Sequence, residues 1–295
     1  MDKIDICIPY IGSGIEYLRY QFKNFVSLAE SPENINFILA CHTEEDKALA
    51  ETLPYKDKIK EVIVTPRWES TNPWVASANH SKSINALVSA STAEYTLLAD
   101  YDIYFLKKNW DTYLLNELIQ KGNNLTGVEY ARMNYQFKFE KKLSWLSNVK
   151  LLKYQQMPNA TLMFFGKRFK SCLDNKLTTF DSYLENNGLP FEFVVTKERA
   201  RINNMELGDM LWLDSCSEIP EIISRNALKY SSFRLSIEDA NAFFGYNSFS
   251  LLHSEIYLNH ENEPLLAHFK KGSAKTKSKD AFSNFCTKVD NYLVD

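Results

Sequence analysis

Two aspartates, one residue apart, are the residues of this sequence whose types and spacing point most directly to chemistry. Asp100 and Asp102 follow residues 95–99, an apolar run with the composition of a buried strand. Carboxylates at the edge of a core lose hydration and become protonated unless a partner offsets their charge. A hard divalent ion is the partner that such an oxygen pair prefers. An aspartate-rich turn that only closes a strand is the alternative interpretation of so short a motif.

The elements that precede this pair predict where its side chains lie. In chain order, the alternating strand-like and helix-like runs are residues 4–9, 15–28, 36–41, 44–53, 59–64, 81–91 and 95–99. This alternation predicts right-handed crossovers and a mostly parallel sheet with helices on both faces. Ligands of such sheets bind beyond the C-terminal ends of the strands, which is the edge where Asp100 and Asp102 fall.

The second half of the sequence is less regular. Its predicted elements are strands at 162–165 and 191–196 and helices at 179–187, 236–245 and 280–293. Residues 270–279 are rich in lysine and poor in apolar residues, which predicts a loop. We interpret the chain as one continuous domain with a first part at 1–110, a second at 111–265 and a C-terminal segment at 266–295.

Composition excludes several classes of protein. The 295 residues are 45% hydrophobic, enough for a sizeable core, and the net charge of -3 gives no general attraction to nucleic acid or anionic membrane. The five cysteines are scattered without a C-x-x-C pair, so neither a disulfide framework nor a zinc site is indicated. No window approaches the roughly 18 apolar residues of a membrane span, and the first residues match a strand instead of an export signal. We therefore expect a cytoplasmic protein.

The order of the motifs resembles the N-terminal half of GT-A glycosyltransferases, particularly family 2-like bacterial enzymes. The features that carry this resemblance are an Ile-x-Ile-Pro loop at 6–9, a polar helix that includes residues 80–86, and the strand that ends in Asp-x-Asp. They occur in order over residues 4–110, and the similarity is looser afterwards. The resemblance implies a GT-A, Rossmann-like α/β fold with a less regular acceptor-binding half.

The resemblance also implies a nucleotide site. Pro9, Tyr10 and Gly12 would form the loop that holds the nucleotide base, and Lys82 and Asn85 would help to bind the nucleotide sugar. Near a helix N-terminus, Lys82 could meet a phosphate that the backbone N–H groups also attract. The alternatives are an ordinary strand-to-helix turn for the loop and a solvated surface lysine for Lys82.

A metal site is implied in the same way. The resemblance assigns Asp102 to a Mn²⁺ or Mg²⁺ ion and Asp100 to the donor ribose or to a shared role on the metal. Residues 266–273 resemble a C-terminal histidine element, which makes His268 the third ligand and Lys270 and Lys271 contacts of the diphosphate. A histidine among apolar neighbours is also compatible with a plain strand residue, and lysine-rich loops are often only solvated.

A catalytic carboxylate is expected roughly a hundred residues after Asp-x-Asp. There Asp209 is the candidate base that removes the acceptor proton, Glu206 is the second candidate, and Trp212 is the candidate for stacking on the acceptor sugar. The family usually has two adjacent acids at this point, whereas here glycine precedes Asp209. A retaining enzyme, in which Asp209 orients the donor sugar, therefore stays open, as does a helix N-cap role for Asp209.

The resemblance implies a metal-dependent glycosyltransferase that moves a sugar from a nucleotide-sugar donor to a hydroxyl of a bacterial surface glycan, such as lipopolysaccharide, O-antigen or capsule. Inversion is the expected stereochemistry. The acceptor would be a glycan or glycolipid, with peripheral association at the inner face of the cytoplasmic membrane left open. One alternative is a nucleotidyltransferase acting on sugar phosphates, but such enzymes have a basic phosphate loop, and residues 10–14 contain no lysine or arginine. The other alternative is a noncatalytic glycan- or nucleotide-binding module.

Overall fold

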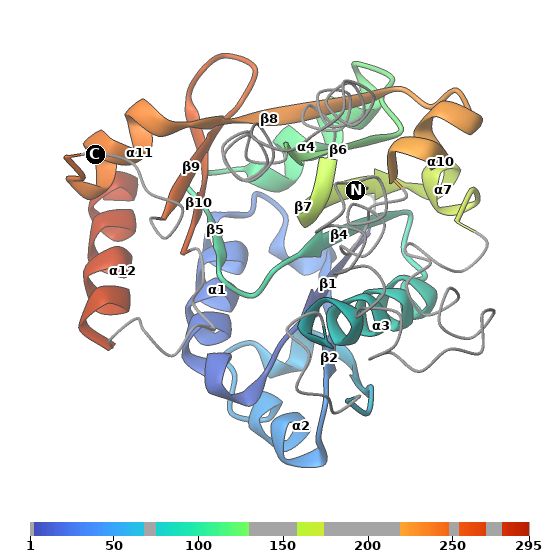
Figure 1. The fold of residues 1–295 in the computed structure, drawn as a ribbon, viewed down its shortest axis with the longest axis horizontal. Helices are drawn as coiled ribbons and strands as arrows, with labels where there is room; N and C mark the ends of the chain where they lie inside the picture. Colours follow the sequence, from blue (N-terminus) through green and yellow to red (C-terminus); the bar gives the residue numbers. More distant parts are fainter. Residues whose placement is uncertain are drawn as a thin grey trace, which may run out of the picture.

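The computed structural model describes residues 3–67, 75–129, 158–173, 219–247, 254–269 and 279–294. Within these residues, ten strands form one mixed sheet in the order β3-β2-β1-β4-β7-β6-β8-β9-β10-β5, with helices packed on both faces (Figure 1). The strands are β1 Ile4–Pro9, β2 Ile35–Cys41, β3 Ile59–Val64, β4 Tyr95–Ala99, β5 Ile103–Phe105, β6 Leu125–Glu129, β7 Pro158–Gly166, β8 Tyr230–Ser236, β9 Glu255–Leu258 and β10 Pro264–His268. The helices are α1 Ile15–Leu28, α2 Glu44–Ala50, α3 Val75–Ala90, α4 Trp110–Ile119, α7 Lys167–Lys170, α10 Ile219–Arg225, α11 Ile237–Phe244 and α12 Lys279–Val294.

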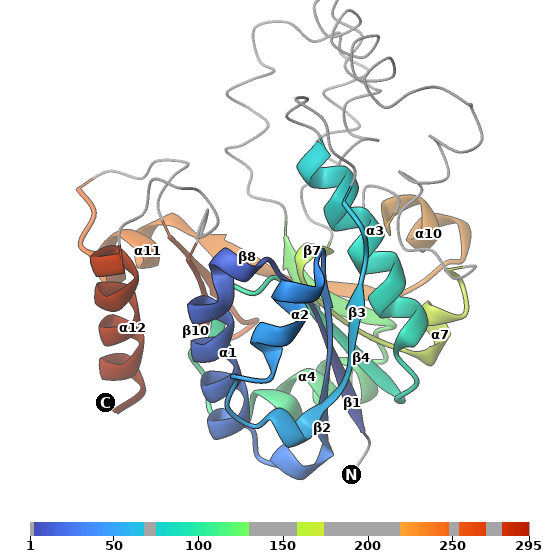
Figure 2. The ribbon, with the colours of Figure 1, turned by 90° about the horizontal axis from the view of Figure 1, so that it is seen from below.

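The first half of the sheet is parallel, as the alternating pattern predicts. Strand β1 pairs in parallel with both β2 and β4, and β2 pairs in parallel with β3. Figure 2 shows α1 on one side of these strands and α3 on the other. Strand β1 supplies both layers, because Ile6 belongs to the apolar cluster under α1 and Cys7 to the cluster under α3. This double coverage explains why β1 is apolar apart from Asp5.

The second half of the sheet is mostly antiparallel. Strand β7 runs antiparallel to β4 and β6, and β8, β9, β10 and β5 pair antiparallel in succession. A short turn joins β9 to β10, in which the side chain of Asn259 accepts hydrogen bonds from the backbone of Glu261 and Glu263. Strands joined by so short a turn must be antiparallel, since a parallel pair needs a longer crossover. The parallel arrangement expected from the sequence therefore applies to the N-terminal half.

One crossing of the chain determines where the site forms. Strand β5 follows β4 almost directly in sequence, yet it lies at the far end of the strand order, paired with β10 (Figure 1). Residues 100–102 therefore span the gap between the parallel strands and the antiparallel strands. His268 ends β10 and pairs in register with Ile103, the first residue of β5, so the fold brings His268 beside Asp102.

Several predicted boundaries shift in the structure. Helix α3 begins at Val75, six residues before the predicted start, and β7 is longer than the predicted strand at 162–165. Ser236 caps α11 by accepting a hydrogen bond from the backbone of Asp239, as its capping-box sequence indicates. The predicted helix at 179–187 and strand at 191–196 lie outside the described residues.

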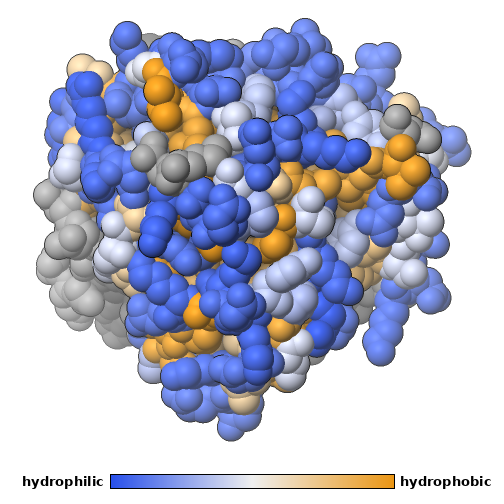
Figure 3. Space-filling model, turned by 180° about the vertical axis from the view of Figure 1, so that it is seen from behind, coloured by the Kyte–Doolittle hydropathy of each residue, from blue (hydrophilic) through white to orange (hydrophobic). Residues whose placement is uncertain are grey.

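Helix α12 completes the antiparallel half. Its Phe282 and Phe285 contact aromatic residues of α1, β5 and the end of β10, including Tyr17, Tyr104 and Phe269. Hydrophilic residues predominate on the face in Figure 3, and apolar residues appear there in separate small groups. Of the helices in the described ranges, none has the length and hydropathy needed to cross a membrane.

Candidate metal and nucleotide site

Three side chains that can bind a metal converge where the two halves of the sheet meet. One ligand atom each from Asp100, Asp102 and His268 lies within 4.8 Å of the other two. The aspartates come from the crossing between β4 and β5, and the histidine comes from the end of β10. Asp102 and His268 are buried, and Asp100 is partly exposed. This group is the metal-ligand set that the sequence predicts.

The histidine of this group lies between two carboxylates. Its Nε2 is 3.4 Å from Oδ1 of Asp102, and its Nδ1 is 3.0 Å from Oε2 of Glu255. Burial opposes the charged imidazolium, but Asp102 and then Glu255 outweigh it and raise the pKa of His268 to about 10. The position between Asp102 and His268 therefore attracts positive charge, and a cation bound at Nε2 would take the place of the proton there.

The chemistry of the donor set fits a divalent cation. Carboxylate oxygens suit hard ions such as Mg²⁺ and Mn²⁺, while an imidazole ligand suits transition metals better than Mg²⁺. Asp100 faces a cavity, so the three protein ligands would cover one side of the ion and leave the other side for ligand or water oxygens. The arrangement resembles an open metal site and not a closed structural one.

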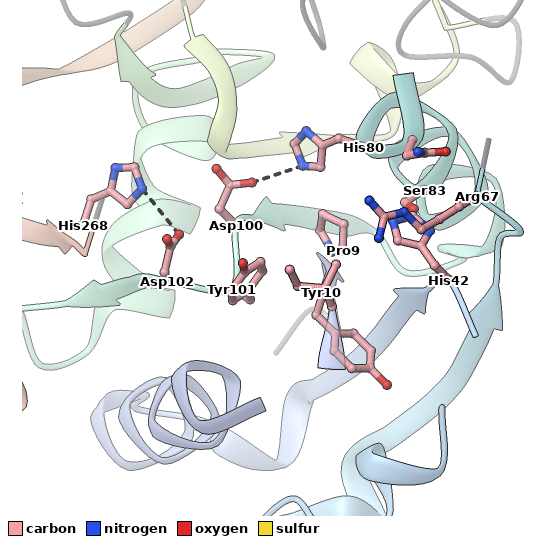
Figure 4. A pocket seen from close by; sticks show the side chains of 12 residues that line it. Pro9, Tyr10, His42, Arg67, His80, Ser83, Asp100, Tyr101, Asp102 and His268 are labelled. Carbon is pink, nitrogen blue, oxygen red and sulfur yellow. Dashed lines mark ion pairs between the residues drawn. The ribbon is translucent and has the colours of Figure 1, made fainter. Parts of the chain in front are cut away.

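A cavity of about 390 Å³ lies next to these ligands. It is built from the C-terminal ends of the four parallel strands together with one face of α3 (Figure 4). The residues that line it are Pro9, Tyr10, Ile11, His42, Arg67, Asn79, His80, Ser83, Asp100, Tyr101, Asp102 and His268. It lies beyond the strand ends, which is where the sequence predicts that ligands bind.

The end of the cavity away from the metal ligands carries His42 and Arg67 (Figure 4). Nδ1 of His42 lies 2.9 Å from the carbonyl oxygen of Thr65, which can only accept, so Nδ1 carries the proton and donates. Burial lowers the pKa of His42, and the positive charge of Arg67 lowers it further, against the opposing effect of the Thr65 carbonyl. The neutral ring therefore presents Nε2 as a hydrogen-bond acceptor, beside the donors of Arg67.

Helix α3 contributes His80 between the two ends of the cavity. Its Nε2 is 3.2 Å from Oδ1 of Asp100, and Figure 4 shows this ion pair with the imidazole directed at the aspartate. Ser83, about one turn later on the same face, hydrogen-bonds the Thr65 side chain at 2.9 Å. The helix therefore fixes Asp100 and the loop after β3 relative to each other.

The predicted base-binding loop reaches the cavity only in part. Pro9 and Tyr10 line it, but the Tyr10 ring points away and its hydroxyl donates to the Asp46 carbonyl oxygen at 2.5 Å (Figure 4). Gly12 is not among the lining residues. A Cβ at Gly12 would lie 2.0 Å from Oδ1 of Asp46, so glycine allows the loop to pack closely on α2.

The two α3 residues predicted from the sequence, Lys82 and Asn85, do not line this cavity. The Nζ of Lys82 donates to the carbonyl oxygen of Pro66 at 2.9 Å, and Asn85 is buried. His80 and Ser83 line it instead. Each residue step turns a helix by about 100°, so a shift of one position changes the face. His80 and Ser83 are three positions apart, a spacing that places both side chains on one face of a helix and could have identified them from the sequence.

Five predicted site residues lie outside the described residues. They are Glu206, Asp209, Trp212, Lys270 and Lys271. Their assignments to catalysis, acceptor binding and diphosphate binding stay predictions. Glu255 and Tyr257 are not predictable from the sequence, because nothing in their local sequence places them beside His268.

No family model and no curated protein matches the sequence. The galactosyltransferase LgtC, solved with donor and acceptor sugar analogs, aligns over 98% of this chain and 95% of its own, with 12% identity and a TM-score of 0.50. A mannosyltransferase from Pyrobaculum calidifontis, in complex with GDP-Man and Mn²⁺, aligns over 59% of this chain and 47% of its own, with 12% identity and a TM-score of 0.39. S. aureus TarS aligns over 62% and 55%, with 14% identity and a TM-score of 0.40.

The comparison with LgtC extends over nearly the whole chain and shows a shared fold. It confirms the predicted GT-A type of α/β fold, a large sheet flanked by helices. The chain spans about half the length of the mannosyltransferase and of TarS.

Proposed function

We propose that this protein is a metal-dependent glycosyltransferase that moves a sugar from a nucleotide-sugar donor to a hydroxyl of a bacterial surface glycan. The observation that carries the proposal is the convergence of Asp100, Asp102 and His268 on a cavity at the C-terminal edge of the parallel strands. The shared fold with LgtC, solved with donor and acceptor sugar analogs, supports it. The surface-glycan acceptor follows from the sequence resemblance alone.

The two ends of the cavity suit the two ends of a nucleotide sugar. The diphosphate lies near Asp100 and Asp102, where a cation offsets its charge. The base lies toward His42 and Arg67, whose acceptor and donors complement a base edge that has an N–H beside a carbonyl oxygen. Uracil and guanine both offer this pattern, so His42 and Arg67 favour a UDP or a GDP donor. They do not specify the donor sugar.

The metal ligands would hold Mn²⁺ or Mg²⁺, and the imidazole of His268 favours Mn²⁺. When bound, the ion supplies Lewis-acid stabilisation of the diphosphate leaving group. Asp102 and His268 fix the ion from the buried side, while Asp100 approaches it from the cavity. His80 restrains the Asp100 carboxylate through its 3.2 Å contact, which keeps that carboxylate directed at the site.

The acceptor side of the reaction belongs to residues predicted from sequence. Asp209, with Glu206 as the second candidate, removes the acceptor proton and gives inversion, and Trp212 stacks on the acceptor sugar. Lys270 and Lys271, which follow His268 after Phe269, neutralise the diphosphate. The reaction takes place in the cytoplasm, at the inner membrane face when the acceptor is a glycolipid.

Thermal-shift measurements with nucleoside diphosphates test this function. We expect UDP or GDP to raise the melting temperature in the presence of Mn²⁺, and we expect chelator or the Asp102→Ala substitution to abolish the rise. Incubation with the matching nucleotide sugar should then release the nucleoside diphosphate. No metal-dependent shift with any nucleotide would indicate a noncatalytic module. Formation of a nucleotide sugar from a nucleoside triphosphate and a sugar phosphate would indicate a nucleotidyltransferase.

A further inference from the structure

Glu255 and Tyr257 form a chain of hydrogen bonds behind the metal-ligand histidine. The Tyr257 hydroxyl donates to Oε2 of Glu255 at 2.9 Å, and the same oxygen lies 3.0 Å from Nδ1 of His268. The relative exposures of Tyr257, Glu255 and His268 are 2%, 1% and 7%, so water competes little for these contacts. Nδ1 faces away from Asp102, which is contacted by Nε2.

The sheet register holds this chain in place. Glu255 is the first residue of β9 and pairs directly with His268, the last residue of β10. Residues opposite each other on neighbouring strands project on the same face, as do residues two apart on one strand, so Tyr257 lies on the face of Glu255. The chain of contacts therefore comes from two directly paired strands, β9 and β10.

We infer that Glu255, held by Tyr257, is a positioning residue that orients His268 for binding a divalent cation. The inference rests on the proposed function, since it assigns a supporting role within the same metal site. Glu255 is not one of the three ligands whose atoms meet within 4.8 Å, so it acts through His268 and not on the ion.

The chemistry of the imidazole gives this contact its effect. A carboxylate at Nδ1 keeps the proton on that nitrogen and leaves the lone pair of Nε2 for the ion. It also makes the imidazole a stronger electron-pair donor, and loss of such an outer partner typically lowers metal affinity by roughly 10- to 100-fold. Tyr257 limits rotation of the carboxylate by donating to the oxygen that faces His268.

Calorimetric titration of the full chain with Mn²⁺ tests this role. We expect Glu255→Gln to weaken Mn²⁺ binding by about 10-fold or more and Tyr257→Phe to weaken it by less. Tyr257→Phe removes only one oxygen, so it keeps the test valid where Glu255→Gln fails to fold. Glu117→Gln is the matched control, because Glu117 is also buried and its Oε2 lies 3.1 Å from Nε2 of His260. We expect this control to bind Mn²⁺ like the wild type.

A double-substitution cycle separates positioning from a merely structural role. Glu255→Gln should cause no further loss of Mn²⁺ affinity in a His268→Ala background, because its effect passes through the imidazole. An equal loss in both backgrounds, or unchanged binding in Glu255→Gln, would overturn the inference while leaving the metal site intact. Wild-type binding no tighter than that of Asp102→Ala would instead remove the proposed metal site and this inference together.

Discussion

Two buried glutamates each contact a histidine in this protein, but their surroundings differ. Glu117 of α4 contacts His260 at 3.1 Å and also Lys121 at 2.6 Å, and it accepts a hydrogen bond from Ser231 at the start of β8. Lys121 is a basic partner, and its side chain is 45% exposed. The Glu117 carboxylate is therefore neutralised by the protein itself.

Glu255 is the first residue of β9, at the opposite end of that strand from His260. It contacts a histidine that a second carboxylate also contacts. His268 lies between Glu255 and Asp102, and Asp100 is close by. The single imidazole of His268 thus faces two buried carboxylates, and the third acid, Asp100, is contacted by His80. A buried acid–histidine contact alone therefore does not indicate a metal site, whereas convergence of several acids and a histidine at the edge of a cavity does.

The largest difference is expected between the two histidines. His268→Ala should weaken Mn²⁺ binding by more than about 100-fold, because it removes a ligand and not an outer partner, whose loss costs roughly 10- to 100-fold. His260→Ala should leave Mn²⁺ binding unchanged, since His260 lies in the turn between β9 and β10, away from the cavity. Manganese titration followed by electron paramagnetic resonance measures both. Equal effects of the two substitutions on Mn²⁺ affinity would contradict the assignment of His268, and not His260, as a metal ligand.

A third buried carboxylate extends the comparison to stability and pH. Asp5 of β1 accepts hydrogen bonds from the backbone N–H groups of Thr92 and Ala93 at 2.8 and 2.9 Å and lies 3.3 Å from Nζ of Lys60. Burial alone would raise the pKa of Asp5, but these partners outweigh burial and lower it. We expect Asp5→Asn to reduce the free energy of unfolding at pH 7 by about 2 kcal/mol.

The pH dependence of the Asp5 effect has a definite sign. Because the folded-state pKa is below the unfolded-state pKa, the ionised carboxylate stabilises the fold fully above the unfolded-state value of about 3.9. That stabilisation is lost as the pH falls through the folded-state pKa. Urea unfolding of both proteins should therefore give a constant difference near neutral pH and a shrinking one in acid. A difference that does not change with pH would contradict this account.

Glu117→Gln should have a smaller effect on stability. Lys121 and His260 are both partly exposed, so water solvates them when the carboxylate is lost, and we expect a decrease of about 1–2 kcal/mol in the free energy of unfolding. Urea denaturation measures the decrease. A weakened Mn²⁺ affinity in this variant would mean that Glu117 and the metal site are coupled, against the prediction that they are independent.

The smallest effect is expected at the base end of the cavity. Arg67 is exposed and lines the cavity, so Arg67→Ala should leave the melting temperature of the free protein unchanged. Loss of the hydrogen bonds that we propose between Arg67 and the base should weaken binding of UDP or GDP by about 10-fold, which corresponds to roughly 1.4 kcal/mol. Calorimetric titration with each nucleotide measures the change. Unaltered affinity for both would remove Arg67 from the site.

The sequence predicts the parts of this site that depend on local pattern. Asp100 and Asp102 were identifiable because they follow a buried strand at the edge where parallel sheets bind ligands. His268 was identifiable only through the resemblance to known enzymes. Strands β1, β2 and β4 matched their predicted ranges closely, since runs buried on both faces give a strong signal. The edge strand β3 matched as well, although it is only partly buried.

The remaining contacts depend on the order of strands and on the phase of a helix. Glu255 reaches His268 because β9 pairs with β10, and no residue near Glu255 in sequence indicates that pairing. His80 and Ser83 face the cavity where Lys82 was expected, because the rotation of α3 is set by packing of Ile84 and Leu87 on the sheet. Local sequence specifies neither the strand order nor this packing.

Binding of a divalent cation between the two halves of the sheet can be observed in crystals of the protein soaked in Mn²⁺ and measured for anomalous scattering. We predict one strong anomalous peak within bonding distance of Asp102 and His268, with Asp100 beside it. A map with no peak at these three side chains, at a manganese concentration that saturates binding in solution, would contradict binding of a cation there.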